Sequence, residues 1–170
     1  MTALRTKTGF ALTPIADEDA DGLLAQPDNR RLVADSYPGF PCRRCLRDAE
    51  IGDAVSLVSY DTFVGTSPHT HPGPIFLHTD GCRPWDGSGD RIPAQLLRRQ
   101  LSVRALDGAH MMRDARIVAG TCLEAAAREL LEDDEVAYLH VHNAAAGCWA
   151  VRIDRVQRRR PVTAPTSSRR

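Results

Sequence analysis

Short apolar segments separated by turn residues are the feature that most limits how this chain can fold. Period-two alternation of apolar and polar residues is typical of strands. An Asp-Gly pair at 107–108 lies between two of the segments, and such pairs are among the strongest short signals of a β-hairpin. We therefore predict a mostly antiparallel sheet built from β-hairpins, with strands at 10–12, 54–60, 74–78, 101–106, 109–119, 136–142 and 147–156.

Only one segment has a clear helical period. Its apolar stripe consists of Leu123, Ala126, Ala127, Leu130 and Leu131. Thr121 and Glu124 have the spacing of a capping box, and the acidic run at 132–135 is unfavourable at a helix C-terminus. We predict one principal helix at about 121–132, packed on the sheet, which makes the fold class α+β. The segments 17–31 and 93–99 indicate at most a weak helical turn and a short helix.

A chain of 170 residues normally forms one domain. We assign residues 1–156 to a single α+β domain and residues 157–170, rich in Arg, Pro, Ser and Thr, to a basic disordered tail. The formal net charge is zero, and no aromatic residues interleave the arginines of the tail. Nucleic-acid binding is therefore not expected. The oligomeric state is not indicated by any pattern.

The N-terminal segment and the hydropathy of the chain predict its compartment, and the compartment predicts the state of the cysteines. No apolar run follows Arg5 and Lys7, so a signal peptide is not expected, and no segment approaches the roughly 20 apolar residues of a membrane span. We therefore expect a cytoplasmic protein without a membrane partner. In that compartment the five cysteines are expected to be free, metal-bound or redox-active rather than paired in disulfides.

The strongest chemical signal is a pair of motifs, Cys42-x-x-Cys45 and His78-x-x-x-Cys82. Two thiolates at this spacing can bind one Zn²⁺ from a tight loop, and a structural zinc site needs four ligands. Together the motifs supply a Cys₃His set for zinc or another transition metal. Two other interpretations remain open: redox or catalytic thiols, and thiols that are simply buried as small apolar side chains.

The same region also contains a possible catalytic arrangement. His78 and Cys82 could act as base and nucleophile, because a thiolate needs a base or a cation nearby at neutral pH. Arg43 would then bind an anionic group, and Asp80 or Asp86 would orient the histidine. The catalytic candidates are therefore Cys82, His78 and Arg43.

Two further groups are secondary candidates for metal binding. His69-x-His71 could chelate a metal from an extended segment, although flanking prolines favour an exposed loop. His140, His142 and Cys148 share one face of the last predicted hairpin, which could be a site wall or a half-solvated outer face.

The predicted register of that hairpin is centred on Ala145. It places His142 opposite Cys148 and Tyr138 opposite Arg152. It places Trp149 on the other face, with the apolar residues Leu139, Val141, Val151 and Ile153.

The motifs of nucleotide and serine chemistry are missing. The chain has no G-x-x-x-x-G-K-[ST] loop, no G-x-G-x-x-G after a strand, no G-x-S-x-G elbow and no H-E-x-x-H. No nucleotide cofactor is therefore expected.

Several short motifs together resemble a bacterial family catalogued only as a domain of unknown function. They are F-P-C-R-R-C-L at 40–46, G-P-I-F-L-H at 73–78, Cys82, and G-C-W at 147–149. The resemblance implies no reaction, but it directs attention to Cys42, Arg43, Cys45, His78, Cys82 and Cys148. His69 and His71 are not part of the pattern.

The leading functional hypothesis is a small cytosolic protein whose Cys/His pocket, with a bound metal, acts on a small molecule. An enzyme is favoured, without a reaction class. The alternatives are a non-catalytic, zinc-stapled binding or regulatory module, and a thiol redox sensor in which Cys42 and Cys45 form a disulfide.

Overall fold

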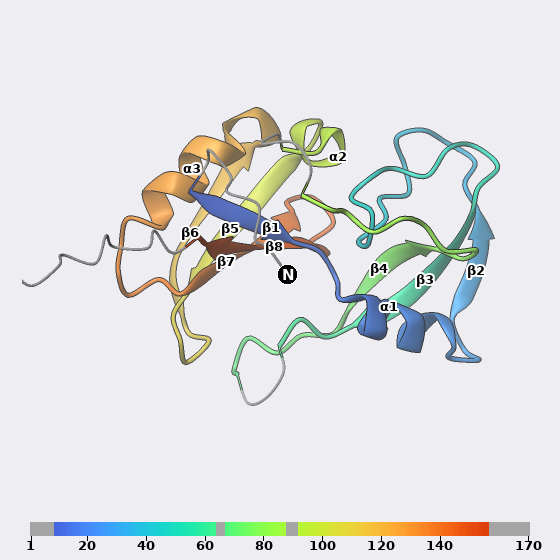
Figure 1. Ribbon diagram of the computed structural model, residues 1–170, viewed down its shortest axis with the longest axis horizontal. Helices are drawn as coiled ribbons and strands as arrows, with labels where there is room; N and C mark the ends of the chain where they lie inside the picture. Colours follow the sequence, from blue (N-terminus) through green and yellow to red (C-terminus); the bar gives the residue numbers. More distant parts are fainter. Residues whose placement is uncertain (1–8, 64–66, 88–91, 157–170) are drawn as a thin grey trace, which may run out of the picture.

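Two antiparallel sheets carry the fold (Figure 1). The computed structural model describes residues 9–63, 67–87 and 92–156. The larger sheet has the strand order β1-β8-β7-β5-β6 and the smaller one β2-β3-β4, and every neighbouring pair is antiparallel. The strands are β1 (Phe10–Thr13), β2 (Arg30–Val33), β3 (Ala54–Tyr60), β4 (Gly73–His78), β5 (Gln100–Leu106), β6 (Met112–Ala119), β7 (Tyr138–Asn143) and β8 (Trp149–Arg155). The predicted α+β class, with a mostly antiparallel, hairpin-rich sheet, is confirmed.

The principal helix is confirmed, but its N-terminus differs from the prediction. Helix α3 (Leu123–Leu130) is preceded by a 3₁₀ turn, η1 (Gly120–Cys122), and contacts β5 and β6. The predicted capping box is wrong, because Cys122 is the N-cap residue and no side chain caps the helix. Thr121 lies inside the 3₁₀ turn, so its hydroxyl is not at the N-cap position.

Two short helices and one strand complete the fold. Helix α1 (Asp17–Leu24) is longer than the weak turn that the sequence predicted, and it contacts β3. Helix α2 (Ala94–Leu97) confirms the short helix predicted after Pro93. Strand β2 was not predicted, because Arg30 and Arg31 are exposed edge residues without apolar alternation.

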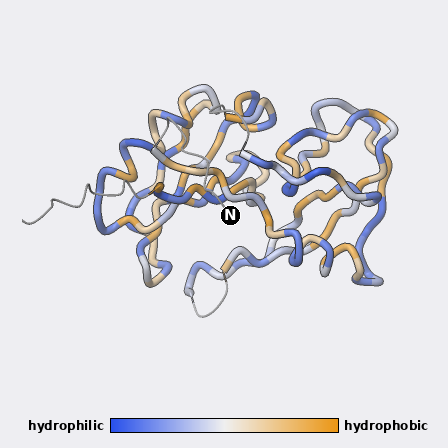
Figure 2. Tube along the Cα trace, in the orientation of Figure 1, coloured by the Kyte–Doolittle hydropathy of each residue, from blue (hydrophilic) through white to orange (hydrophobic). Residues whose placement is uncertain are grey.

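The larger sheet has the larger core. One face of β5, β7 and β8 packs against the apolar stripe of α3, and Val103, Leu139, Val151 and Ile153 are fully buried there. Hydrophobic segments alternate with hydrophilic ones along these strands in Figure 2. The smaller sheet is flanked by two smaller apolar clusters.

The register predicted for the last hairpin is wrong by two residues. Tyr138 pairs with Asp154 and His140 with Arg152, not Tyr138 with Arg152. Between Val141 and His142 the register shifts, so that His142 pairs with Trp149 rather than with Cys148. A β-bulge of this kind adds one residue to one strand and moves the following side chains to the opposite face. Trp149 therefore lies on the histidine face, and the prediction that it joins Leu139 and Val141 is wrong.

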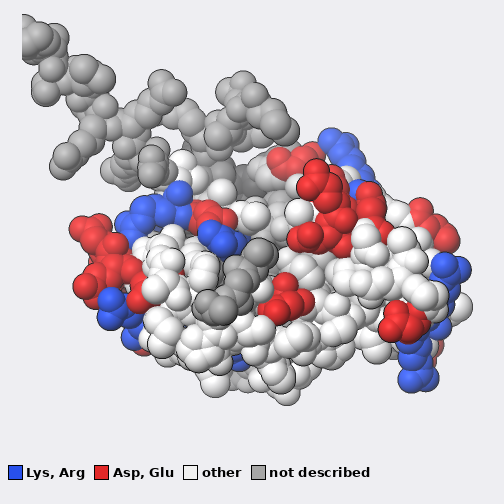
Figure 3. Space-filling model, turned by 90° about the horizontal axis from the view of Figure 1, so that it is seen from below, with Lys and Arg blue, Asp and Glu red and all other residues white. Residues whose placement is uncertain are grey.

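The surface carries charges of both signs. Arg side chains lie next to Asp and Glu side chains in several places on the face shown in Figure 3. No helix in the described part of the chain is both long enough and apolar enough to cross a membrane. The tail predicted at 157–170 lies outside the described residues, and the assignment of 1–156 to one domain stays a prediction.

Candidate metal centre

A tight turn between β2 and β3 presents the first two thiols. The backbone N–H of Ala49 donates to the carbonyl of Phe40 and that of Cys42 to the carbonyl of Arg47, both at 2.9 Å. Leu46 closes the turn with a φ of 53°, in the left-handed region. That conformation costs a non-glycine residue about 1–2 kcal/mol. The Leu46 side chain is fully buried in the large core, which offsets this cost.

The other two ligand candidates come from the end of β4. The turn is held against β4 by the N–H of Arg43, which donates to the carbonyl of Phe76 at 3.1 Å. His78 is the last residue of that strand. Gly81, with a φ of 83°, turns the chain back so that Cys82 faces the turn. Two segments distant in sequence therefore converge on one point.

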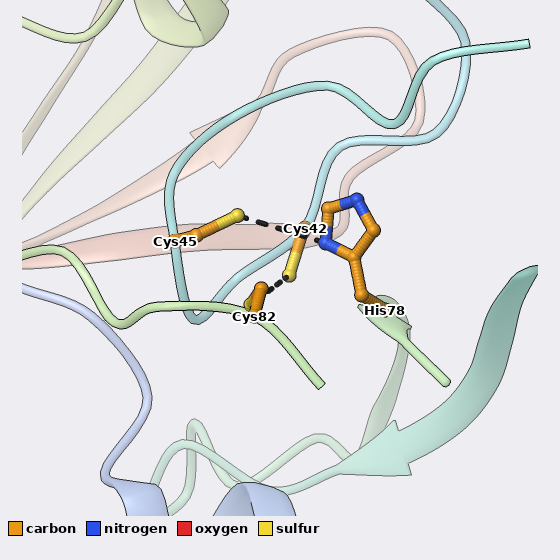
Figure 4. Close-up of side chains that lie close together, drawn as sticks. All are labelled: Cys42, Cys45, His78 and Cys82. Carbon is orange, nitrogen blue, oxygen red and sulfur yellow. Dashed lines mark hydrogen bonds between the residues drawn. The ribbon is translucent and has the colours of Figure 1, made fainter. Parts of the chain in front are cut away.

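The four side chains point toward one another (Figure 4). Their ligand atoms all lie within 4.8 Å of one another. The Sγ atoms of Cys42 and Cys82 are 3.8 Å apart, and Sγ of Cys45 lies 3.6 Å from Nδ1 of His78. Around a tetrahedral zinc ion, two thiolates are about 3.8 Å apart and a thiolate and an imidazole nitrogen about 3.6 Å. The cluster could hold a metal ion.

Hydrogen bonding within the cluster favours a Cys42 thiolate beside a protonated His78. Hydrogen bonds with Cys45 and Cys82 lower the pKa of Cys42, and hydrogen bonds with Cys42 and Cys45 raise the pKa of His78 to about 10. The hydrogen bond with Cys42 raises the pKa of Cys82. Arg47 is an adjacent cation, and hydrogen bonding to Cys45 raises its pKa. Because a metal ion binds the unprotonated side chains, an ion that binds here must displace the protons of His78 and Cys82.

A carboxylate that the sequence did not identify lies behind the histidine. Oδ2 of Asp53 is 3.5 Å from Nε2 of His78, the ring nitrogen that faces away from the cluster. Asp80 and Asp86 were the predicted orienting residues; Asp86 instead forms an ion pair with Arg83 at 2.9 Å. Asp53 lies near His78 because Val55, two residues further along the chain, pairs with His78 between β3 and β4. The sequence alone does not give that register.

Of the three catalytic candidates, His78 and Cys82 lie together in the cluster, whereas the Arg43 guanidinium contacts other residues. His78 contacts Cys45, whereas Cys82 contacts Cys42. The Arg43 guanidinium lies in the protein interior: it donates from Nε to the carbonyl of Trp149 at 2.5 Å, from Nη1 to that of Pro41, and from Nη2 to Sγ of Cys148 at 3.2 Å. Burial lowers the pKa of Arg43.

The secondary candidates lie elsewhere. His69, His71, His142 and Cys148 line a separate cavity of about 270 Å³. His140 is buried, and its ring lies 5.1 Å from the Phe63 ring and 6.4 Å from the Trp149 ring. Burial lowers the pKa of His140 to about 3 and that of His142 to about 4. Among the described residues, the Cys₃His cluster is the one group of at least three such side chains close enough to share a metal ion.

Comparison with known proteins gives one match. A family model described as "Protein of unknown function (DUF1203)" matches residues 39–155, a range that includes all four cluster residues. This match confirms the resemblance seen in the motifs at 40–46 and 73–78. Neither the curated proteins nor the solved structures contain a significant match.

Proposed function

The chain belongs to the DUF1203 family of proteins of unknown function, and from its own geometry we propose that it is a zinc-dependent binding protein. Its Cys₃His cluster holds one zinc ion that staples the 40–49 turn to β4. The observation that carries this proposal is the convergence of four ligand atoms within 4.8 Å of one another, with 3.8 Å between two sulfurs and 3.6 Å between a sulfur and a nitrogen.

The donor set favours zinc in a structural role. Three thiols and one imidazole are soft and intermediate ligands, which suit zinc better than magnesium or calcium. Four protein ligands complete a tetrahedral shell, whereas a catalytic zinc keeps a position open for water or substrate. We therefore favour the non-catalytic role of the ion over the metal enzyme that the sequence led us to favour.

The cluster lies beside the smaller sheet, which has little apolar core of its own to stabilise it. The smaller sheet has three strands, and its flanking apolar clusters include Ala34, Ala49 and Ala20, which bury little area. A small core is commonly reinforced by a metal or a disulfide. The zinc ion would fix the turn that carries Arg43 and Pro41, which line a cavity of about 500 Å³. That volume suits a small-molecule ligand.

Elemental analysis of freshly purified protein, combined with thiol titration, tests the proposal. We expect about one zinc per chain. In the native protein Cys122 and Cys148 should react with the thiol reagent, whereas the cluster thiols should react only after denaturation. Cys82→Ser should lose the metal, whereas Cys122→Ser, at an exposed cysteine outside the cluster, should keep it. A metal-free protein with all five thiols titratable would contradict the proposal.

Mild hydrogen peroxide on the same sample tests the redox-sensor alternative. A sensor would lose two cluster thiols as a disulfide while peroxide is reduced to water, and it would release the metal. Unchanged thiol and metal contents after treatment would argue against this alternative.

A further inference from the structure

The smaller cavity, of about 270 Å³, has a basic lining. Arg104 and three histidines, His69, His71 and His142, line it, and no Asp or Glu is among the described lining residues. Arg104 is half-buried and forms no ion pair or hydrogen bond with another described residue. Burial lowers the pKa of His142, and the positive charge of Arg104 lowers it further. A cavity with such a lining favours an anionic ligand.

A buried N–H donor in the same lining has no partner. Trp149 is 6% exposed, and its Nε1 makes no hydrogen bond within the described part of the chain. An indole N–H can only donate. Most buried polar groups in folded proteins have a hydrogen-bond partner, so this donor indicates an acceptor that is supplied from outside the chain. The oxygen atoms of an anion are acceptors of this kind.

His142 adds one acceptor to this lining. Its Nδ1 lies 2.9 Å from the carbonyl oxygen of Gly147, and because a carbonyl oxygen only accepts, Nδ1 carries the proton. Burial lowers the pKa of His142 to about 4, so the ring is neutral at pH 7 and Nε2 has a free lone pair. No other described residue donates a hydrogen bond to Nε2. A ligand that donates one hydrogen bond therefore suits this nitrogen.

We propose that the smaller cavity binds a small oxyanion that carries a hydroxyl group, of the type of hydrogen phosphate. Its oxygens accept hydrogen bonds from the Arg104 guanidinium and the Trp149 N–H, and its hydroxyl donates to Nε2 of His142. Arginine binds phosphate oxygens through charge-assisted hydrogen bonds. The cavity volume is below the roughly 300–1,000 Å³ of sites for drug-sized ligands, which suits an ion. None of these three residues belongs to the Cys₃His cluster, so the proposal does not depend on the metal.

Calorimetric titration of the intact protein with sodium phosphate and sodium sulfate, at pH 7 and equal ionic strength, tests the proposal. Both ions offer oxygen acceptors, but sulfate has no hydroxyl to donate. A site that binds a hydroxyl group rejects an analogue without it, so we expect phosphate to bind at least tenfold more tightly. Methyl phosphate, mostly a dianion at pH 7 because the second pKa of a phosphate monoester is about 6, should bind as weakly as sulfate. Absence of phosphate binding, or equal affinities for phosphate and sulfate, would overturn the proposal.

Three variants assign the contacts. Trp149→Phe keeps an aromatic ring but removes the N–H, and it should weaken phosphate binding about tenfold; Trp85→Phe, at a tryptophan that lines another cavity, is its control. Arg104→Gln should weaken binding further, whereas Arg128→Gln, at an exposed arginine on α3, should not. His142→Phe should abolish the preference for phosphate over sulfate. Unchanged phosphate affinity in Trp149→Phe and Arg104→Gln would overturn the proposal, and the comparison of the two ions in the unmodified protein requires no variant to fold.

Discussion

Single side chains behind the metal centre set the orientation of its ligands. Oδ2 of Asp53 lies near Nε2 of His78, and it also accepts a hydrogen bond from the backbone N–H of Glu50 at 2.9 Å. A carboxylate in this position fixes the ring and makes it a better ligand. Asp53 would therefore support a metal ion held by the cluster without contacting the ion itself.

The substitution Asp53→Asn tests this role. It keeps an oxygen that can accept the Glu50 N–H but removes the negative charge from His78. We expect zinc affinity to fall by about 10–100-fold, measured by competition with a chromophoric chelator. Asp28→Asn changes an exposed aspartate outside the site and is the matched control. Equal affinities in the two variants would show that Asp53 does not support the histidine.

Two buried histidines make stability depend on pH. Burial lowers the pKa of His140 to about 3 and that of His142 to about 4, and both should return to about 6.5 on unfolding. The unfolded chain thus binds more protons between about pH 6.5 and 4. The free energy of unfolding should fall as the pH drops through this window, by up to about 1.4 kcal/mol per pH unit for each histidine.

Urea denaturation at several pH values measures this slope. Arg104 and Arg152 pair with His140 on the two neighbouring strands, and their positive charges lower its pKa further. The negative charge of Asp154 acts in the opposite direction and raises that pKa. His140→Phe removes one of the two titrating groups and also the unpartnered Nδ1 atom. It should lower the slope by about half without loss of stability at pH 7. A slope identical to that of the unmodified protein would contradict the assignment.

At the scale of secondary structure, Gly120 has the closest backbone neighbour of the glycines in the described part of the chain. A Cβ atom added there would lie 1.9 Å from the carbonyl oxygen of Leu96 in α2. The N–H of Gly120 donates to the carbonyl of Arg99 at 2.8 Å, so the contact cannot open freely. Glycine is required here by the packing of η1 against α2, not by its φ.

Gly120→Ala should therefore destabilise the protein by about 3 kcal/mol, because the two backbones must separate. Gly22 in α1 offers the opposite case: nothing lies within 4 Å of its added Cβ. Gly22→Ala should stabilise the protein by up to about 1 kcal/mol through helix propensity. Thermal unfolding of both variants measures the contrast, and similar shifts in the two would refute the argument.

Elements were more predictable than their pairings. The strands at 54–60 and 74–78, the Asp-Gly hairpin and α3 follow from periodicity and turn residues in the sequence. The convergence of Cys42, Cys45, His78 and Cys82 was also expected from ligand spacing. The bulge that moves Trp149 and the register that brings Asp53 to His78 were not, because both depend on contacts between strands. Sequence spacing carries no direct record of those contacts.

At the scale of the whole molecule, the two sheets differ in what stabilises them. The five-stranded sheet has the large core beneath α3, whereas the three-stranded sheet has small clusters and the proposed zinc staple. Trp149 connects them: it extends from β8 into the cluster with Cys42, and its ring lies 5.3 Å from that of Tyr60 on β3. Loss of the ion should therefore act first on one side of the molecule.

Hydrogen exchange with and without a strong chelator tests this asymmetry. We expect amide protection to fall in the 40–49 turn and in β3 and β4, because the staple that joins them is removed. Protection in β5 and β7 should persist, since their core does not include the metal ligands. Cys82→Ser, which should bind no metal, is the control and should not respond to chelator. Equal loss of protection in both sheets would instead show one cooperative unit, in which the metal stabilises the whole fold.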